Sequence, residues 1–118
     1  MNIIDMAIID ELRTMLGDDA PGVLSDLVSE FIDESSALVT RIEGALAARE
    51  FDVVCECAHK MIAPARSFGA HPLGDLAREL EDAAAAGDEV TVQTTFARLK
   101  QMFADVERVL RAIATSAR

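Results

Sequence analysis

Hydrophobic positions recur along this chain at intervals of three and four residues, which is the spacing of one face of an α-helix. The clearest run lies near the C-terminal end and predicts a long amphipathic helix. Its apolar positions are Val92, Phe96, Leu99, Phe103, Val106, Leu110 and Ile113. A helix buries a stripe of this kind against neighbouring helices. We therefore expect these side chains, together with Phe31 and Phe68, to form the core.

The same spacing predicts a short helix and a long helix in the first half of the chain. The short helix spans residues 3–16 and ends at Gly17, and its predicted buried face consists of Ile4, Ile8, Leu12 and Met15. The long helix begins at Pro21, because proline is favoured in the first helical turn. Its stripe contains Leu24, Val28, Phe31, Ser35, Leu38, Ile42 and Ala45.

Two further helices are predicted between these and the C-terminal one. The third spans residues 52–68 and stops at Gly69, while the fourth begins at Pro72 and closes at Gly87. The fourth helix buries Leu73, Leu76 and Leu80. Short connections favour antiparallel neighbours. We predict an all-α fold, an antiparallel four-helix bundle with a short additional N-terminal helix, in which residues 1–118 form a single domain.

Charge and cysteine usage narrow the classes of function. The formal net charge is −10, which repels nucleic-acid phosphates and anionic lipids, so we expect neither nucleic acid nor a membrane as a partner. Cys55 and Cys57 lie two apart on a predicted helix and point in different directions, so we expect no disulfide between them. Reduced thiols, no long apolar run and no basic N-terminal leader favour a cytoplasmic protein. We expect a monomer.

The third predicted helix carries a histidine opposite its apolar stripe. That stripe comprises Val54, Cys57, Ala58, Met61, Ala65 and Phe68. By helical geometry His59 lies about 150° from the centre of the stripe, on the solvent side. Ala63, one turn later, is small enough for another protein to approach the imidazole. Arg66, two turns later, can offset negative charge that arrives on the ring. Neutral imidazole is itself a competent nucleophile.

Residues 58–70 read Ala-His-Lys-Met-Ile-Ala-Pro-Ala-Arg-Ser-Phe-Gly-Ala, and this segment resembles the phosphohistidine helix of histidine phosphotransfer (HPt) domains. That family usually has Ala-His, an apolar residue two positions after the histidine, and Gly-Ala at the end of the helix. Ala58, His59, Met61, Gly69 and Ala70 match this pattern. The resemblance continues at residues 12–18, around Phe31, and at Leu73, Leu76, Leu80-Glu81 and Gly87-Asp88, so it covers nearly the whole chain.

The sequence departs from the family pattern just after the histidine. The usual lysine is replaced by Ile62 and the usual glycine by Ala63. Pro64 cannot donate a backbone hydrogen bond to Lys60, so we expect a kink there. Arg66 is the expected substitute for the missing lysine beside the phosphate, and Lys60, which points to another side, is a weaker one. Ile62, at the edge of the outer face, is expected to add an apolar contact for a partner.

The resemblance implies a function and a set of partners. HPt domains take a phosphoryl group onto the histidine from a receiver-domain aspartate, or from a histidine kinase or hybrid kinase, and pass it to another receiver. By this resemblance His59 is the phosphorylated residue, while Arg66, Ala63, Ile62 and Lys60 contact the phosphate or the partner. Mg²⁺ is expected on the receiver, so this chain is a phosphocarrier without a cofactor or autonomous catalytic activity. The alternative is a degenerate bundle that binds or inhibits a receiver or kinase without carrying phosphate.

The remaining polar residues do not indicate a metal site or an enzyme active site. The motif Cys55-x-Cys57-x-His59 has a spacing found in metal sites, but Cys57 belongs to the apolar stripe and structural zinc needs four converging ligands, so we expect no metal. His71 is predicted to be a cap or loop residue. No Gly-rich phosphate loop or nucleophile elbow is present to suggest an enzyme. The solvated side of the fourth helix is predicted to carry Glu79, Glu81 and Asp82.

Overall fold

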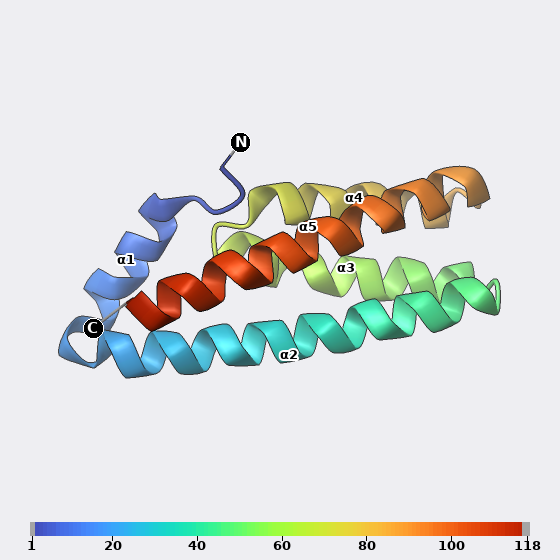
Figure 1. Cartoon of the computed structure of the whole chain (residues 1–118). Coiled ribbons are helices and arrows are strands. Elements are labelled where there is room, and N and C mark those ends of the chain that lie inside the picture. The colour runs from blue at the N-terminus through green and yellow to red at the C-terminus, as the bar shows by residue number, and fades with distance from the viewer. Residues whose placement is uncertain (1, 117–118) are drawn as a thin grey trace.

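The computed structural model describes residues 2–116 and confirms the predicted all-α fold (Figure 1). Its elements are α1 (Met6–Leu16), the short 3-10 helix η1 (Gly17–Asp19), α2 (Ala20–Ala47), α3 (Phe51–Ser67), α4 (His71–Ala85) and α5 (Glu89–Ser116). Within the described residues the chain forms no strand. Each of the long helices α2 to α5 runs antiparallel to the one before it, and α1 lies at one end of the bundle (Figure 1).

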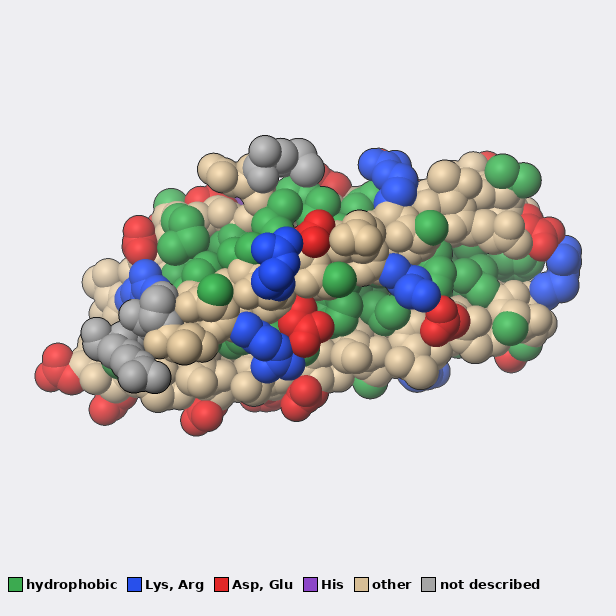
Figure 2. Space-filling view, in the orientation of Figure 1, with side chains coloured by type: hydrophobic (Ala, Val, Ile, Leu, Met, Phe, Trp, Pro, Cys, Tyr) green, Lys and Arg blue, Asp and Glu red, His purple; other side chains and the backbone are tan. Residues whose placement is uncertain are grey.

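The four long helices form a closed ring of neighbours. α2 packs on α3, α3 on α4, α4 on α5, and α5 returns to α2, while α1 packs on α2. The pair formed by α3 and α4 is the most closely packed. Among residues 2–116, every helix is too short or too polar to span a lipid bilayer. On the face shown in Figure 2, acidic and basic side chains are interspersed and apolar atoms show between them.

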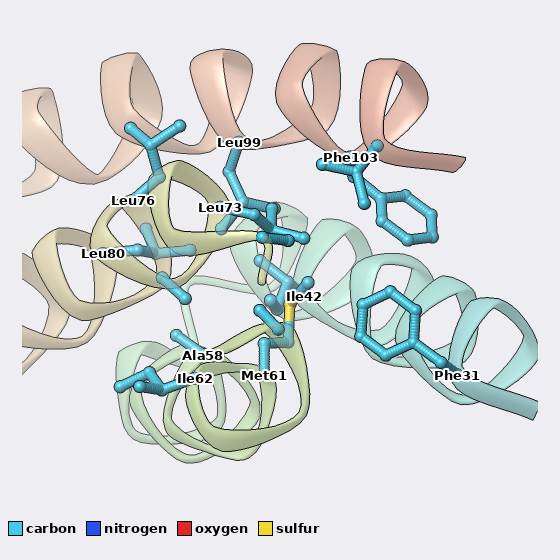
Figure 3. Packing of buried hydrophobic residues seen from close by; sticks show 14 of the residues in the cluster. Phe31, Ile42, Ala58, Met61, Ile62, Leu73, Leu76, Leu80, Leu99 and Phe103 are labelled. Carbon is cyan, nitrogen blue, oxygen red and sulfur yellow. The ribbon is translucent and has the colours of Figure 1, made fainter. Parts of the chain in front are cut away.

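The core lies where the apolar stripes of the four long helices meet (Figure 3). Ile42 comes from α2, Met61 from α3, Leu80 from α4 and Leu99 from α5, and all four are buried. Burying one such side chain contributes about 1.5–3 kcal/mol. The stripe predicted for α5 is buried throughout, which confirms the periodicity argument; it comprises Val92, Phe96, Leu99, Phe103, Val106, Leu110 and Ile113.

Ile4 is buried as predicted, but along α1 itself the predicted face was wrong by one step around the helix. Met15 was expected in the core, yet it is 81% exposed, and Ile9 is fully buried in its place. The helix begins at Met6 rather than at residue 3, with the Asp5 carboxylate accepting a hydrogen bond from the Ala7 N–H at 3.1 Å. Because α1 touches the bundle only at its end, it buries a narrow stripe centred on Ile9, with Leu12 and Leu16 half-buried.

Two further expectations concern the end of α3. The helix continues through Pro64 to Ser67, and the kink expected there stays a prediction. Gly69 follows in the left-handed region with φ +75°, as expected of a helix stop. Phe68, predicted to be core, is only half-buried, because it lies at this helix end, where its ring rests 5.0 Å from the ring of Phe31.

Candidate functional site

His59 lies on the outer side of α3, as the helical periodicity predicted. Its side chain is 70% exposed. The neighbouring positions Ala58 and Met61 point the other way and are buried in the core. The apolar stripe therefore fixes α3 on the bundle and leaves the imidazole on the surface, where another protein can reach it.

The histidine is held by a carboxylate from the next helix. Nδ1 of His59 lies 2.8 Å from Oε2 of Glu81, whose side chain on α4 is only 22% exposed. The prediction that Glu81 belongs to the solvated side of its helix was therefore wrong, because the packing of α4 on α3 brings it to the histidine. A carboxylate oxygen can only accept a hydrogen bond, so this contact favours a proton on Nδ1. In the neutral ring this leaves the lone pair on Nε2.

A thiol lies next to this pair. Cys55 is half-buried, one turn before the histidine on α3. Burial raises the pKa of the Cys55 thiol, and the carboxylates of Glu81 and Asp82 raise that pKa further. The edge where α3 meets α4 therefore carries a concentration of negative charge close to His59.

Neither basic residue predicted on α3 contacts the imidazole. Arg66 pairs through Nη2 with Oδ1 of Asp75 at 3.5 Å, and its stem crosses α4 at Gly74, where an added Cβ would come within 3.1 Å of Arg66 Cγ. Arg66, the expected substitute for the missing lysine, is thus directed toward α4, because the missing side chain at Gly74 leaves room for its stem. Lys60 pairs with Glu56 at 3.1 Å on its own helix.

Ile62 and Ala63, the third and fourth residues after the histidine, differ in exposure. Ala63 is exposed on the same side of α3 as His59, as predicted. Ile62 is only 9% exposed, so the prediction that it offers an apolar contact to a partner was wrong. Its backbone lies under α4, with the Ile62 carbonyl oxygen 3.6 Å from the position of an added Cβ at Gly74. The close approach of α4 therefore covers Ile62 and leaves Ala63 free.

The remaining chemical candidates do not form a site. Among residues 2–116, no group of three or more His, Cys, Asp or Glu side chains is placed to hold a metal ion. Cys57 is fully buried, on the opposite side of α3 from the exposed His59. His71 is the first residue of α4, and its Nε2 lies 3.4 Å from Oδ2 of Asp5. It thus belongs to the contact between α4 and the segment before α1.

Comparisons with known proteins identify the fold and the family of this chain. The family model described as the Hpt domain matches residues 26–109, a stretch that contains both His59 and Glu81. The solved structure of histidine-containing phosphotransfer protein B from Pseudomonas aeruginosa PAO1 matches with a TM-score of 0.87, 21% sequence identity, and coverage of 98% of this chain and 97% of that chain. At this identity the likeness establishes the fold. No curated protein sequence matches significantly. Because the family model covers well over half of its length, the chain belongs to the Hpt domain family.

Proposed function

We propose that this chain carries a phosphoryl group on Nε2 of His59 and relays it between signalling proteins, receiving it from a phosphorylated receiver domain or a kinase. The observation that carries the proposal is the exposed imidazole held through Nδ1 by Glu81 at 2.8 Å. An exposed histidine without such a contact would be free to rotate and to exchange tautomers. Membership of the Hpt domain family supports the same conclusion.

Glu81 acts as a positioning residue in this proposal. Its contact with Nδ1 favours the tautomer whose lone pair lies on Nε2. When Nε2 forms a bond to phosphorus, the ring that retains its Nδ1 proton becomes positively charged. The carboxylate of Glu81 stabilises this charge, in the way that a buried aspartate stabilises the histidine of a catalytic triad.

In the transfer step His59 is the group of this chain that bonds to phosphorus. The Nε2 lone pair attacks the phosphorus of an aspartyl phosphate, the N–P bond forms, and the P–O bond to the aspartate breaks with its electron pair remaining on the carboxylate. The reverse step delivers the group to a second receiver. Mg²⁺ in the receiver's acidic pocket would shield the phosphoryl oxygens. Catalysis then rests on positioning and charge, and this chain remains a carrier.

The docking surface in this proposal is the outer side of α3 around His59. Ala63 is exposed one turn later and presents no bulk to an approaching protein. Lys60 and Arg66 stand at the edges of this surface, each already paired with a carboxylate. A receiver, whose active site is acidic, would meet Lys60 and Arg66 at the edges of this surface. Its carboxylates would then replace Glu56 and Asp75 as the ion-pair partners of these two cations.

The test is phosphorylation of the purified chain by a phosphorylated receiver, and separately by potassium phosphoramidate, a small donor that releases ammonia. We expect an acid-labile, base-stable phosphoryl group located on His59 by mass spectrometry. Phosphorus NMR should identify the Nε2 isomer, and Glu81→Ala should add the Nδ1 isomer. A pure Nδ1 product in the parent would contradict the role given to Glu81.

Two histidine variants complete the design. His59→Gln should lose labelling and keep its circular dichroism spectrum, because the ring is exposed. His71→Gln is the matched control and should label like the parent, since His71 lies at the other end of the α3–α4 pair, beside Asp5. If the parent binds a phosphorylated receiver but neither donor labels His59, the chain is a docking module of this family that carries no phosphate.

A further inference from the structure

The position that usually supplies a lysine to the phosphohistidine is occupied here by the buried Ile62. A phosphoryl group carries close to two negative charges, and Glu81 and Asp82 already make this edge of the bundle acidic. The basic side chains of α3 and α4, apart from histidine, are Lys60, Arg66 and Arg78. We propose that Arg78 on α4 is the cation that binds the phosphoryl oxygens on His59. This inference rests on the proposed function.

Contacts on both sides of Arg78 fix its place along α3. Glu81, one turn after it on α4, contacts His59. Gly74, one turn before it, lies against Ile62 and Arg66. Residues three and four apart on a helix share a face. Arg78 therefore stands between these two contacts, on the edge of α4 that faces α3 and opposite the turn that follows His59.

The orientation of α4 places Arg78 on the solvent side of this edge. Ala77, its neighbour, is buried in the core, and Glu79, on the other side, points to α5, where it pairs with Arg98. Arg78 itself is 60% exposed and reaches toward the C-terminal end of α4, with its Nε 3.6 Å from Oδ1 of Asp82. Its guanidinium thus lies on the turn of α4 that also carries Glu81, the residue that contacts the imidazole.

Arg78 is also the most available of the three cations. Lys60 is held by Glu56 at 3.1 Å, and the stem of Arg66 is laid across Gly74 toward Asp75, two turns beyond the histidine. At 3.6 Å the Arg78–Asp82 contact is the longest of the three, and the Arg78 side chain is the most exposed, at 60% against 52% for Lys60 and 46% for Arg66. An exposed pair of this kind contributes little. The Arg78 guanidinium can leave Asp82 and bind a dianionic phosphoryl group. Because the guanidinium is planar, it can donate two parallel hydrogen bonds to two phosphoryl oxygens.

The experiment labels the full chain with potassium phosphoramidate and follows the labelling rate and the hydrolysis of the phosphohistidine at low and high salt. Arg78→Ala should slow labelling by about two- to fivefold at low salt, the range expected for an exposed charge pair. High salt should shrink the difference, since it screens exposed charges. Arg78→Lys should recover part of the rate. Arg98→Ala, which removes an exposed arginine paired with the other side of α4, should behave like the parent.

The outcomes separate this inference from the function on which it rests. If the parent is labelled on His59 and Arg78→Ala is labelled as fast at low salt, Arg78 is not the phosphoryl cation. If Arg66→Ala slows labelling more than Arg78→Ala, the cation comes from α3 and the inference is overturned in favour of Arg66. If the parent takes no label from phosphoramidate or a receiver, the proposed function fails first. Equal melting curves for all variants show that a loss of rate is not a loss of fold.

Discussion

The backbone N–H of Asp5 donates a hydrogen bond to the carbonyl oxygen of Gly69 over 2.8 Å. This contact seats the segment before α1 on the turn between α3 and α4. Gly69 has φ +75°, and a Cβ at this position would stand 2.8 Å from the carbonyl oxygen of Asp5. Two features therefore favour glycine at position 69: its backbone is in the left-handed region, and the segment before α1 approaches it closely.

Gly69→Ala should lower the free energy of unfolding by about 1–3 kcal/mol, because alanine is strained at this φ and its Cβ collides with the backbone of Asp5. Gly44→Ala is the matched control. Gly44 lies inside α2 with open space around it, so alanine there should stabilise the protein by about 0.5–1 kcal/mol. Urea denaturation measures both changes. Equal stability of Gly69→Ala and the parent would mean that the segment before α1 does not press on the turn.

Phe103→Ala tests the core where α5 meets α2. Phe103 is buried, and Figure 3 shows it on the same side of the core as Phe31. Removing a buried aromatic ring costs the lost burial and leaves a cavity, about 3–5 kcal/mol in all. The loss should appear in urea denaturation as a lower midpoint with an unchanged slope. A loss below about 1 kcal/mol would show that the site collapses around the smaller side chain or that the ring is more exposed than in this structure.

The fold could be predicted because the spacing of apolar residues within a long helix is enough to identify the face that it buries. The stripe of α5 repeats without interruption, so a wrong register would expose several large side chains at once. In α1 the stripe is short, and Ile8, Ile9, Leu12, Met15 and Leu16 allow two overlapping faces. Only the contact with the bundle end selects Ile9 over Met15. The periodicity alone could not make that choice.

The site could be predicted only where it depends on one helix. The exposure of His59 follows from the stripe of α3, and the structure confirms it. The partnership with Glu81 depends on how α4 slides along α3, which no intra-helical pattern records. Its one signal in the sequence was the Leu80-Glu81 pair that resembles the family. The placements of Arg66 and Ile62 depend on the same packing, since both lie where α4 approaches α3 at Gly74, and the role of Arg66 beside a phosphoryl group stays a prediction.

Ala63→Glu should block docking of a receiver and leave the chemistry of His59 intact. The new side chain adds bulk beside the imidazole and a negative charge that faces the receiver's acidic pocket. Labelling by phosphoramidate, which needs no docking, should fall by no more than about two- to fivefold, the range that one exposed charge causes. Ala104→Glu, at an exposed position on α5, is the control and should bind normally. Normal receiver binding by Ala63→Glu would place the docking surface elsewhere on the bundle.

The thiol of Cys55 offers a test of the α3–α4 register that does not depend on phosphorylation. Alkylation proceeds through the thiolate. Burial and the carboxylates of Glu81 and Asp82 raise the pKa of Cys55, so its thiolate forms at higher pH than in an unfolded chain and its alkylation profile should shift upward. The carboxyl and imidazole groups within one turn on α3 are those of Asp52, Glu56 and His59.

Glu81→Gln removes one of the negative charges that oppose the thiolate, so the pKa of Cys55 should fall and alkylation at a fixed, mildly alkaline pH should become faster. Asp82→Asn should shift the profile in the same direction by less, because Glu81 is the larger of the two charge effects. Asp75→Asn is the control: Asp75 lies near the start of α4, paired with Arg66, and its loss should leave the profile unchanged. Peptide mass spectrometry separates Cys55 from the buried Cys57.

If Glu81→Gln does not move the profile, the Glu81 carboxylate does not lie beside Cys55. The same displacement would take it away from His59, one turn further along α3, and Nε2 would no longer be selected as the phosphoryl acceptor.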